Sequence, residues 1–386
     1  MEVIMIDGIQ FAGVASGIKV NGLDLGLAFF KEPTNCLSLY TRNKIKAAHI
    51  LYDRKIEHHP VRAILVNSGC ANACTGKEGV SDLKTIAGEL SGILRTSNEE
   101  ILFASTGVIG RRLPTDRMIS ALPGLCKGLK NNNIESFARS IMTTDTYPKI
   151  VSETIHGKKA YNIIGVAKGA GMINPLFATM LSFVFTDYPV SPSRIKGIFS
   201  KAGKETFERV TVDGECSTND TVTLFTKTGE EDLDGLDDFK DKLNLVMKEL
   251  SIMIVKDGEG ATRVIHITVQ GAKKQEHAEK IARRIAVSPL TKTAFFGCDP
   301  NWGRIIAAAG DADVPLRPSK IEIIMQGRQL VKESIEVPFD EQELKKMMNK
   351  KEIELTVDLH DGKASFDIYT TDLTYDYIKI NASYRS

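Results

Sequence analysis

Residues 165–187 read GVAKGAGMINPLFATMLSFVFTD, in which a glycine-rich loop and a proline lead into a long apolar run. Glycine and proline favour a sharp change of chain direction, and the apolar run from Thr179 onward is typical of a buried strand. A threonine hydroxyl therefore stands where a loop enters the core. Because threonine is also a favourable strand residue, simple packing of Thr179 is the commoner explanation of this pattern alone, and catalysis is the alternative.

Strand-like and helix-like patterns alternate on both sides of this segment. Residues 63–66 form a short apolar run, and residues 81–94 follow with apolar side chains at helical spacing. Further helices are expected over residues 134–142, 193–207 and 239–254, and strands over residues 221–225, 264–269, 321–325, 353–357 and 364–369. Interleaved helices and strands predict an α/β or α+β fold.

The length of the chain predicts two domains. Its 386 residues exceed the roughly 250–300 at which one hydrophobic core stops growing. No proline-rich or serine-rich linker divides the chain, so the expected boundary rests on a change of pattern near residue 275. We expect a main α/β domain over residues 1–275, which carries the catalytic segment, and a smaller C-terminal α+β domain over residues 276–386.

Composition argues against several classes of partner. Fifty basic and 49 acidic residues leave a net charge of +1, without the basic excess that nucleic-acid binding requires. Six cysteines are too few for a disulfide framework in a chain of this length. The most apolar stretch, residues 172–184, is too short and too polar to span a bilayer. We expect a cytoplasmic protein that binds neither nucleic acid nor membranes.

Three motifs suggest a ligand but have the wrong spacing. Residues 69–77, GCANACTGK, resemble a phosphate-binding loop, yet the glycines are too far apart and Glu78 takes the place of the required Ser or Thr. Residues 169–171 lack the third glycine of a dinucleotide fingerprint. Cys70 and Cys74 lack a second pair of ligands, so we expect no metal site here and two small buried cysteines.

The motifs KGAGMI and ATML within residues 168–181 resemble the self-cleavage segment of the ornithine acetyltransferase (ArgJ) family, also called glutamate N-acetyltransferase. The chain is similar to this family in six further stretches: residues 67–76 (NSGCANACTG), 105–110 (STGVIG), 142–149 (MTTDTYPK), 257–262 (DGEGAT), 299–304 (DPNWGR) and 380–386 (INASYRS). These motifs follow the family's order and span nearly the whole chain, which is therefore identified as a member.

The resemblance implies that the precursor cleaves its own peptide bond between Ala178 and Thr179, giving an α chain of residues 1–178 and a β chain of residues 179–386. It also implies a layered α-β-β-α-like sandwich similar to that of N-terminal-nucleophile enzymes. A threonine hydroxyl is a weak nucleophile and needs a nearby base. The α-amine that cleavage releases has a reference pKa of about 7.7–8.0, so one cut supplies nucleophile and base on the same residue.

The implied reaction is acetyl transfer in arginine biosynthesis: N2-acetylornithine acetylates Thr179, and glutamate then takes the acetyl group. The family places oxyanion stabilisation on the residues that match Thr106 and Gly107, which by pattern alone would form an ordinary tight turn. Lys168 suits a carboxylate and Glu259 an ammonium group, although as isolated residues both could be exposed loop charges. The implied substrate contacts are Thr144, Lys168, Thr179, Glu259, Asn381 and Ser386.

The resemblance further implies an α2β2 heterotetramer without a cofactor, which acts on N-acetylornithine and glutamate. It leaves open whether acetyl-CoA also serves as a donor, which would make the enzyme bifunctional. Thr143 and Asp145 flank Thr144 and are expected to support it. Two alternatives remain: a self-processing aminopeptidase or amidase, in which water replaces glutamate, and a non-catalytic amino-acid-binding protein, in which Thr179 is structural.

Overall fold

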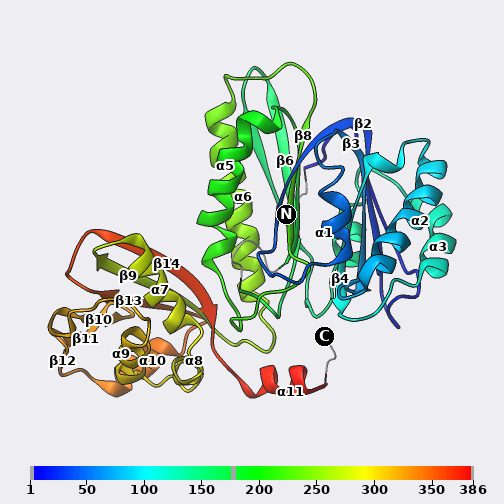
Figure 1. Ribbon diagram of the computed structural model, residues 1–386. Helices are drawn as coiled ribbons and strands as arrows, with labels where there is room; N and C mark the ends of the chain where they lie inside the picture. Colours follow the sequence, from blue (N-terminus) through cyan, green and yellow to red (C-terminus); the bar gives the residue numbers. More distant parts are fainter. Residues whose placement is uncertain (1–3, 175–179, 384–386) are drawn as a thin grey trace. The chain divides into compact units, whose positions relative to one another are not determined.

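The computed structural model describes residues 4–174 and 180–383, which form two compact units (Figure 1). Of the described residues, the first unit contains those up to Glu208 together with Cys216–Ile254, and the second contains Arg209–Glu215 and residues 255–383. This division precedes the boundary expected at residue 275, because strand β9 (Val264–Ala272) pairs with strands of the second unit. An apolar strand pattern does not say which sheet the strand will join.

A mixed sheet forms the centre of the first unit. Its strands follow the order β4-β3-β2-β8-β7-β6-β5, and β1 pairs with β2. The long strand β2 pairs with β3 through its first part and with β8 through its second, and the pairing with β3 is interrupted around Pro33, which lacks a backbone donor. The strands are β1 (Ile9–Val14), β2 (Leu25–Tyr40), β3 (Val61–Cys70), β4 (Ile101–Val108), β5 (Lys149–His156), β6 (Ala160–Lys168), β7 (Leu181–Pro189) and β8 (Thr221–Lys227).

Two parts of this sheet face each other across an aromatic core. The rings of Phe11 in β1 and Phe185 in β7 lie 5.1 Å apart between centroids, although the two strands are not neighbours in the sheet. Phe185 also stacks on Phe225 of β8, with 5.2 Å between centroids. Such ring contacts bury large apolar surfaces and hold the two layers at a fixed spacing.

Helices cover the outer faces of the two layers (Figure 1). Val246 and Leu250 of α6 pack so closely on β6 that a Cβ at Gly165 would lie 2.6 Å from each of them. The helices of this unit are α1 (Ala48–Asp53), α2 (Gly76–Leu94), α3 (Thr115–Lys127), α4 (Ile134–Ser140), α5 (Pro192–Glu205) and α6 (Leu236–Lys256). The prediction of a layered, mixed α/β fold is confirmed.

The second unit has its own sheet and its own core. The strand order is β12-β11-β10-β13-β9-β14, and Ile281 and Ile285 of α7 are fully buried in the same core cluster as Ile267 of β9. The strands are β9, β10 (Glu322–Met325), β11 (Arg328–Lys332), β12 (Ile335–Glu336), β13 (Glu352–Asp358) and β14 (Ala364–Thr371). The helices are α7 (Gln275–Ala286), α8 (Pro289–Phe296), α9 (Trp302–Gly310), α10 (Glu341–Met348) and α11 (Tyr375–Ser383).

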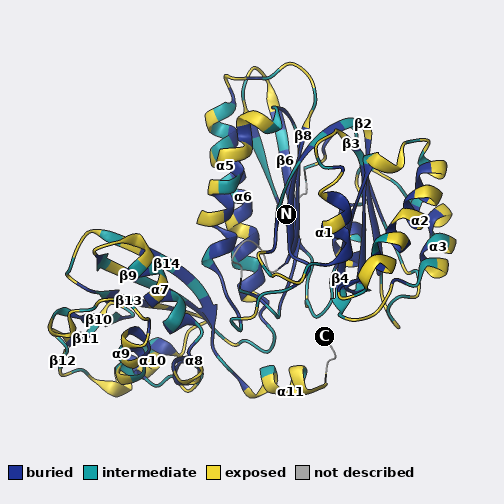
Figure 2. Ribbon diagram, viewed as in Figure 1, coloured by how far each residue is buried: buried dark blue, intermediate teal, exposed yellow. Residues whose placement is uncertain are grey.

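Burial follows the patterns on which the sequence predictions rest. Figure 2 shows strands that are buried along most of their length and helices whose outer faces are exposed. The helices expected over residues 134–142, 193–207 and 239–254 correspond to α4, α5 and α6, and the expected strands correspond to β8, β9, β10, β13 and β14. Within the described ranges, no helix has both the length and the apolar character needed to cross a membrane.

Candidate active site

Thr106 and Gly107 lie next to the end of strand β4, which runs parallel to β3. Gly107 is paired with Gly69, and both have a positive φ, 127° and 97° respectively. A Cβ at Gly107 would lie 2.3 Å from the carbonyl carbon of Gly69, so no side chain fits between the two strand ends. The backbone next to the Thr106 hydroxyl is therefore fixed by a close approach of the two strands.

Lys168 ends strand β6 and brings a cation to the same place. Its Nζ donates a hydrogen bond of 3.1 Å to Oγ1 of Thr106. Lys168 is 8% exposed and Thr106 is 9% exposed, so the ammonium group lies where little water screens it. β6 and β4 are far apart in the strand order, and the folding of the sheet into two layers joins their ends. The structure thus brings together two of the residues that the resemblance singled out.

Asp145 anchors the loop that contains Thr144 next to Lys168. Its Oδ1 accepts hydrogen bonds from Lys149 Nζ at 2.8 Å and from Gly169 N at 2.6 Å, and its Oδ2 accepts one from Thr143 N at 3.0 Å. The side chains of Asp145 and Lys149 are both 0% exposed. The expected supporting role of Asp145 therefore has a structural basis, and Thr144 lies partly buried between two anchored residues.

The pKa of Asp145 reflects these contacts. Burial acts to raise the pKa of the carboxyl, but the charges of Lys149 and Lys168 and the hydrogen bond from Gly169 outweigh it. The net pKa lies below the ordinary value, so Asp145 is ionised at neutral pH. The negative charge of Asp145 offsets one of the two neighbouring lysine charges, and the ammonium of the second, Lys168, donates to Thr106.

Sequence reasoning missed two charged residues near Lys168, namely Lys19 and Asp220. Burial lowers the pKa of Lys19, with Lys168 lowering it further while Asp24 and Asp145 oppose the shift. The Lys19 ammonium donates to the carbonyl of Met142 at 3.0 Å. Neither residue belongs to a motif of recognised spacing, and a loop lysine distant in sequence gives no signal of its position in the fold.

The other missed residue is Asp220. It is fully buried, and burial raises the pKa of its carboxyl well above the usual range although the charge of Lys168 acts in the opposite direction. Asp220 precedes Thr221, the first residue of β8. A strongly raised pKa produced by burial beside a specific charged partner is frequent among residues of functional sites.

The proposed nucleophile lies outside the described residues, as do Ala178 and Ser386. The described chain resumes at Met180, whose carbonyl accepts a hydrogen bond of 3.0 Å from Thr221 N. Leu181 is the register partner of Lys168 in the pairing of β6 with β7. The strand that follows Thr179 in sequence is therefore bonded directly to the strand that ends in Lys168.

Glu259 and Asn381 belong to the second unit, where the structure brings them together. Asn381 Nδ2 donates to Glu259 Oε2 at 2.9 Å and to the carbonyl of Tyr377 at 3.0 Å. The loop that holds Glu259 approaches α11 closely, because a Cβ at Gly260 would lie 2.4 Å from Tyr377 N. Thr374 Oγ1 donates to the carbonyl of Gly260 at 2.7 Å and accepts from Tyr377 N at 3.1 Å, which links the loop to the helix.

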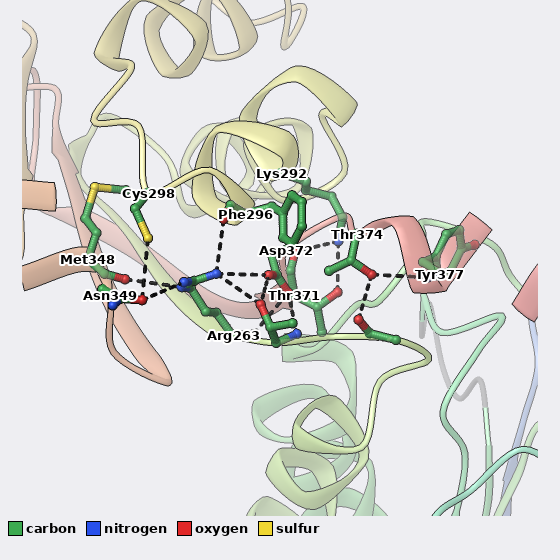
Figure 3. A network of polar contacts seen from close by, with 12 residues as sticks. Arg263, Lys292, Phe296, Cys298, Met348, Asn349, Thr371, Asp372, Thr374 and Tyr377 are labelled. Atoms are coloured by element: carbon green, nitrogen blue, oxygen red, sulfur yellow. Dashed lines mark hydrogen bonds and ion pairs between the residues drawn. The ribbon is translucent and has the colours of Figure 1, made fainter. Parts of the chain in front are cut away.

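A polar network supports this edge of the second unit (Figure 3). Asp372 accepts hydrogen bonds from the backbone N–H groups of Thr262 at 2.9 Å and Arg263 at 3.1 Å. Lys292 donates to the carbonyls of Val212 and Thr371, at 2.6 Å each. Burial lowers the pKa of Lys292 to about 8, although nearby acids act to raise it. These bonds fix the chain that leads into α11.

The arrangement suits reactions at a carbonyl carbon. Among the described residues, no group of three or more His, Cys, Asp or Glu side chains could hold a metal ion. Cys70 is buried, as expected, but the same expectation for Cys74 is wrong because its residue is exposed. Cys74 lies in the short loop between the end of β3 at Cys70 and the start of α2 at Gly76. A buried cation, a hydroxyl and a constrained glycine can together stabilise a negatively charged oxygen.

Sequence and structure comparisons agree with this chemistry. A sequence model described as the ArgJ family matches residues 10–386. A Geobacter sulfurreducens protein named arginine biosynthesis bifunctional protein ArgJ is 41% identical over 391 residues, which cover 99% of this chain and 100% of that protein. A protein of the same name from Desulfotalea psychrophila is 42% identical over 393 residues, with coverage of 99% and 100%. The crystal structure of the Bacillus halodurans protein of that name has 37% identity and a TM-score of 0.50, and the match covers 53% of this chain and 100% of the solved chain.

Proposed function

Because the chain belongs to the ArgJ family, we propose that it transfers the acetyl group of N2-acetylornithine to glutamate through an acetylated Thr179. Membership of this family makes the chain an acetyltransferase of arginine biosynthesis. The covalent intermediate and the roles of individual residues are what the proposal adds.

The contact between Lys168 and Thr106 is the observation that carries the proposal. Acyl transfer passes through a tetrahedral intermediate with a negative oxygen, and each well-placed donor to that oxygen commonly contributes about 10²- to 10³-fold in rate. The Thr106 hydroxyl and the N–H of Gly107 are the proposed donors. The Lys168 ammonium, 3.1 Å from that hydroxyl, adds a positive potential in a buried place.

The proposed chemistry starts and ends on Thr179. Its hydroxyl attacks the acetyl carbonyl of the donor, its own α-amine takes the hydroxyl proton, and the same proton leaves with the ornithine amine. The amine of glutamate then attacks the acetyl ester, and Thr179 regains its hydroxyl. Support comes from the pairing of Leu181 with Lys168, because this register brings the strand after Thr179 beside the ammonium group.

Self-cleavage between Ala178 and Thr179 is part of the proposal, since it creates the α-amine. Residues 179–386 are 208 of the 386 residues, or 54% of the chain. The solved Bacillus halodurans chain is matched over its whole length by 53% of this chain, whereas relatives known from sequence match 99%. A half-length chain is what cleavage near the middle of the precursor would produce.

The remaining substrate contacts are proposed by resemblance, with support from their surroundings. Lys168 offers a buried ammonium to a carboxylate, and Thr144 lies in the loop that Asp145 anchors beside it. In the second unit, the bond between Asn381 and Glu259 orients a carboxylate that suits the side-chain ammonium of ornithine. Ser386 is assigned by resemblance alone.

Three further features belong to the same proposal. We place the enzyme in the cytoplasm, as an α2β2 heterotetramer of cleaved chains that acts on small molecules without a cofactor. The groups required for the chemistry all come from the protein in this scheme. The word bifunctional in the names of the relatives makes acetyl-CoA the first alternative donor to examine.

Substitution of Thr179 tests the proposal. Thr179→Ala should yield one uncut chain without transfer activity, because the hydroxyl serves both cleavage and acetyl transfer. Thr179→Ser is the matched control and should give two fragments and measurable transfer, since it keeps the hydroxyl and the amine. The readouts are denaturing electrophoresis and the rate of N-acetylglutamate formation from N2-acetylornithine. Substantial activity of the alanine variant would refute the role of Thr179, and acetate release in place of N-acetylglutamate would favour an amidase.

A further inference from the structure

The segment Thr218–Thr221 lies in the first unit and leads into strand β8. All four of its residues are buried. The proposed transfer scheme gives no role to Asn219, a buried amide within this segment. Because buried polar side chains are almost always hydrogen-bonded, the partners of Asn219 show which parts of the chain it holds together.

The Asn219 amide joins the two strand ends that meet at Gly107. Its Nδ2 donates hydrogen bonds to the carbonyl of Ala71 at 2.6 Å and to the carbonyl of Ser105 at 2.7 Å. Ala71 follows the last residue of β3, and Ser105 precedes Thr106 in β4. The amide therefore uses both of its donor hydrogens on the backbone that carries the proposed oxyanion donors.

A third hydrogen bond closes a ring around the two proposed oxyanion donors. The N–H of Ala71 donates to the carbonyl of Val108 at 3.0 Å. The ring runs from the Asn219 amide through Ala71 to Val108 on one side and through Ser105 on the other. The chain is thus held on both sides of the donors, and the side chain that completes the ring is that of Asn219.

The orientation of the Asn219 amide is itself fixed. Thr218 Oγ1 donates to Asn219 Oδ1 at 2.5 Å. The carbonyls of Ala71 and Ser105 can only accept hydrogen bonds, so the nitrogen of the amide must face them. The Thr218 hydroxyl therefore stabilises the orientation in which both donor hydrogens reach the strand ends.

The same segment is bonded to the strand that follows the proposed nucleophile in sequence. The N–H of Thr221 donates to the carbonyl of Met180 at 3.0 Å, and Met180 directly follows Thr179. The Thr221 hydroxyl donates to the carbonyl of Asn219 at 3.0 Å and lies 3.1 Å from His49 Nε2. Burial lowers the pKa of His49 to about 3, so this ring is neutral. One short segment therefore connects the oxyanion donors with the first described residue after Thr179.

We propose that Asn219 is a positioning residue, which holds Thr106 and Gly107 at a fixed distance from the strand that follows Thr179. This role rests on the proposed function, in which the nucleophile and the oxyanion donors act on the same carbonyl group. Displacement of such groups by about 1 Å can cost about 10²-fold in rate. The amide carries no charge, so it acts on the reaction through geometry.

Steady-state kinetics of Asn219→Ala test this role. The variant loses both hydrogen bonds to the strand ends, so kcat for acetyl transfer from N2-acetylornithine to glutamate should fall by about 10²-fold. KM for N2-acetylornithine should change by less than about threefold, because Asn219 is not among the proposed substrate contacts. Rates are expressed per cleaved chain, measured by denaturing electrophoresis, and circular dichroism checks that the variant is folded.

Asn35→Ala is the matched control. Nδ2 of Asn35 also donates to two backbone carbonyls, those of Val190 at 3.3 Å and Lys227 at 3.4 Å. Lys227 is the last residue of β8, whereas Asn219 lies before the first. A comparable pair of bonds is thus lost at the other end of the same strand, and kcat and KM should both stay within about twofold of the wild type.

Thr218→Val is a milder variant of the same arrangement. It keeps the size of the side chain and leaves the Asn219 amide in place, but it removes the hydroxyl that orients this amide. Loss of one hydrogen bond of this kind should lower kcat by roughly two- to tenfold, with KM unchanged.

Three results would overturn the assignment: a folded Asn219→Ala with wild-type kcat, an equal loss of kcat in Asn35→Ala, or a loss confined to KM. If Asn219→Ala does not fold, Thr218→Val decides, and wild-type kcat in that variant overturns the assignment. The same assay judges the proposed function separately. That function fails if the wild type forms no N-acetylglutamate or if Thr179→Ala is active, whereas wild-type kcat in Asn219→Ala beside an inactive Thr179→Ala removes only the positioning role.

Discussion

Each unit buries a lysine, but the two lysines are held in different ways. In the first unit, Lys149 contacts the carboxylate of Asp145 at 2.8 Å, and both side chains are 0% exposed. In the second unit, Lys292 is 4% exposed, and its ammonium donates to backbone carbonyls and threonine hydroxyls. Burial therefore lowers the pKa of Lys292 to about 8. The first site offsets the buried charge with a carboxylate, whereas the second satisfies the ammonium with neutral hydrogen-bond acceptors.

The difference matches what each region does. In the first unit, Asp145 pairs with Lys149 beside a second lysine, Lys168, whose ammonium donates to Thr106. The carbonyl contacts of Lys292 tie together chain segments that lead into α11 and make no use of its charge beyond those hydrogen bonds. Substitutions at the two lysines and their partners should therefore affect different properties.

The largest expected effect on stability comes from removing the carboxylate of the buried pair. Asp145→Asn leaves the ammonium of Lys149 buried without a counter-charge, and breaking a buried ion pair in this way typically costs about 3–5 kcal/mol of unfolding free energy. Urea denaturation followed by circular dichroism measures the loss. Lys149→Met/Asp145→Asn is the control and should recover part of it, because Lys149 then no longer carries a buried charge. A cost below about 1 kcal/mol for Asp145→Asn would show that the pair is not what holds this loop.

Substitution of Lys168 should affect catalysis more than folding. Lys168→Met keeps a long side chain but removes the positive charge beside Thr106, so we expect kcat/KM for N2-acetylornithine to fall by about 10²-fold. Lys168→Arg should lie between this variant and the wild type, because it keeps the charge with a different shape. Steady-state rates measured together with circular dichroism spectra separate the two effects. A Met variant that folds normally and retains full kcat/KM would contradict the role of this ammonium.

The pH dependence of stability should reveal Lys292. Its pKa is about 8 in the folded protein against an ordinary value of 10.5, so between these values the unfolded chain binds more protons than the folded one. Unfolding free energy should then rise with pH by about 1.4 kcal/mol per unit over this range from this group, and this contribution is constant below pH 8. Lys292→Met should lack the rise. Parallel pH profiles for the wild type and this variant would mean that the lysine keeps its ordinary pKa.

The smallest effect is expected at the exposed contact in the second unit. Asn381→Ala removes one hydrogen bond to Glu259, and a bond of this kind contributes about 0.5–1.5 kcal/mol, or roughly two- to tenfold in binding. We expect a change of that size in the KM for N2-acetylornithine with little change in stability. Asn244→Ala is a suitable control, because it removes a comparable exposed contact to a carboxylate, Glu205, in the first unit. Equal KM values for the wild type and Asn381→Ala would remove this residue from the substrate contacts.

Much of the fold could be predicted from local patterns, because each expected strand and helix repeats apolar residues at the spacing of its own geometry. The domain boundary could not, since β9 joins its sheet through pairing with β13 and β14, which lie far along the chain. The wrong prediction that Cys74 is buried has a similar cause. Small residues in a glycine-rich loop are buried or exposed according to the backbone path, and the path is set by the close approach of β3 and β4.

The candidate site could be predicted only where a motif named its residues. Thr106 and Lys168 are 62 positions apart and end strands that are not neighbours, so their contact follows from the two-layer arrangement and from no local pattern. Lys19 and Asp220 show the same limit, because their proximity to Lys168 depends on chain segments from opposite ends of the first unit. Sequence motifs gave residue types, and the packing of the sheet gave their electrostatic setting.

Mass spectrometry of the protein after brief exposure to N2-acetylornithine is the most direct test of the central claim. We predict a fragment that begins at Thr179 and carries one additional acetyl group on that residue, which disappears when glutamate is added. A chain without a terminus at Thr179, or a cleaved and active enzyme that never carries the acetyl group there, would contradict the account.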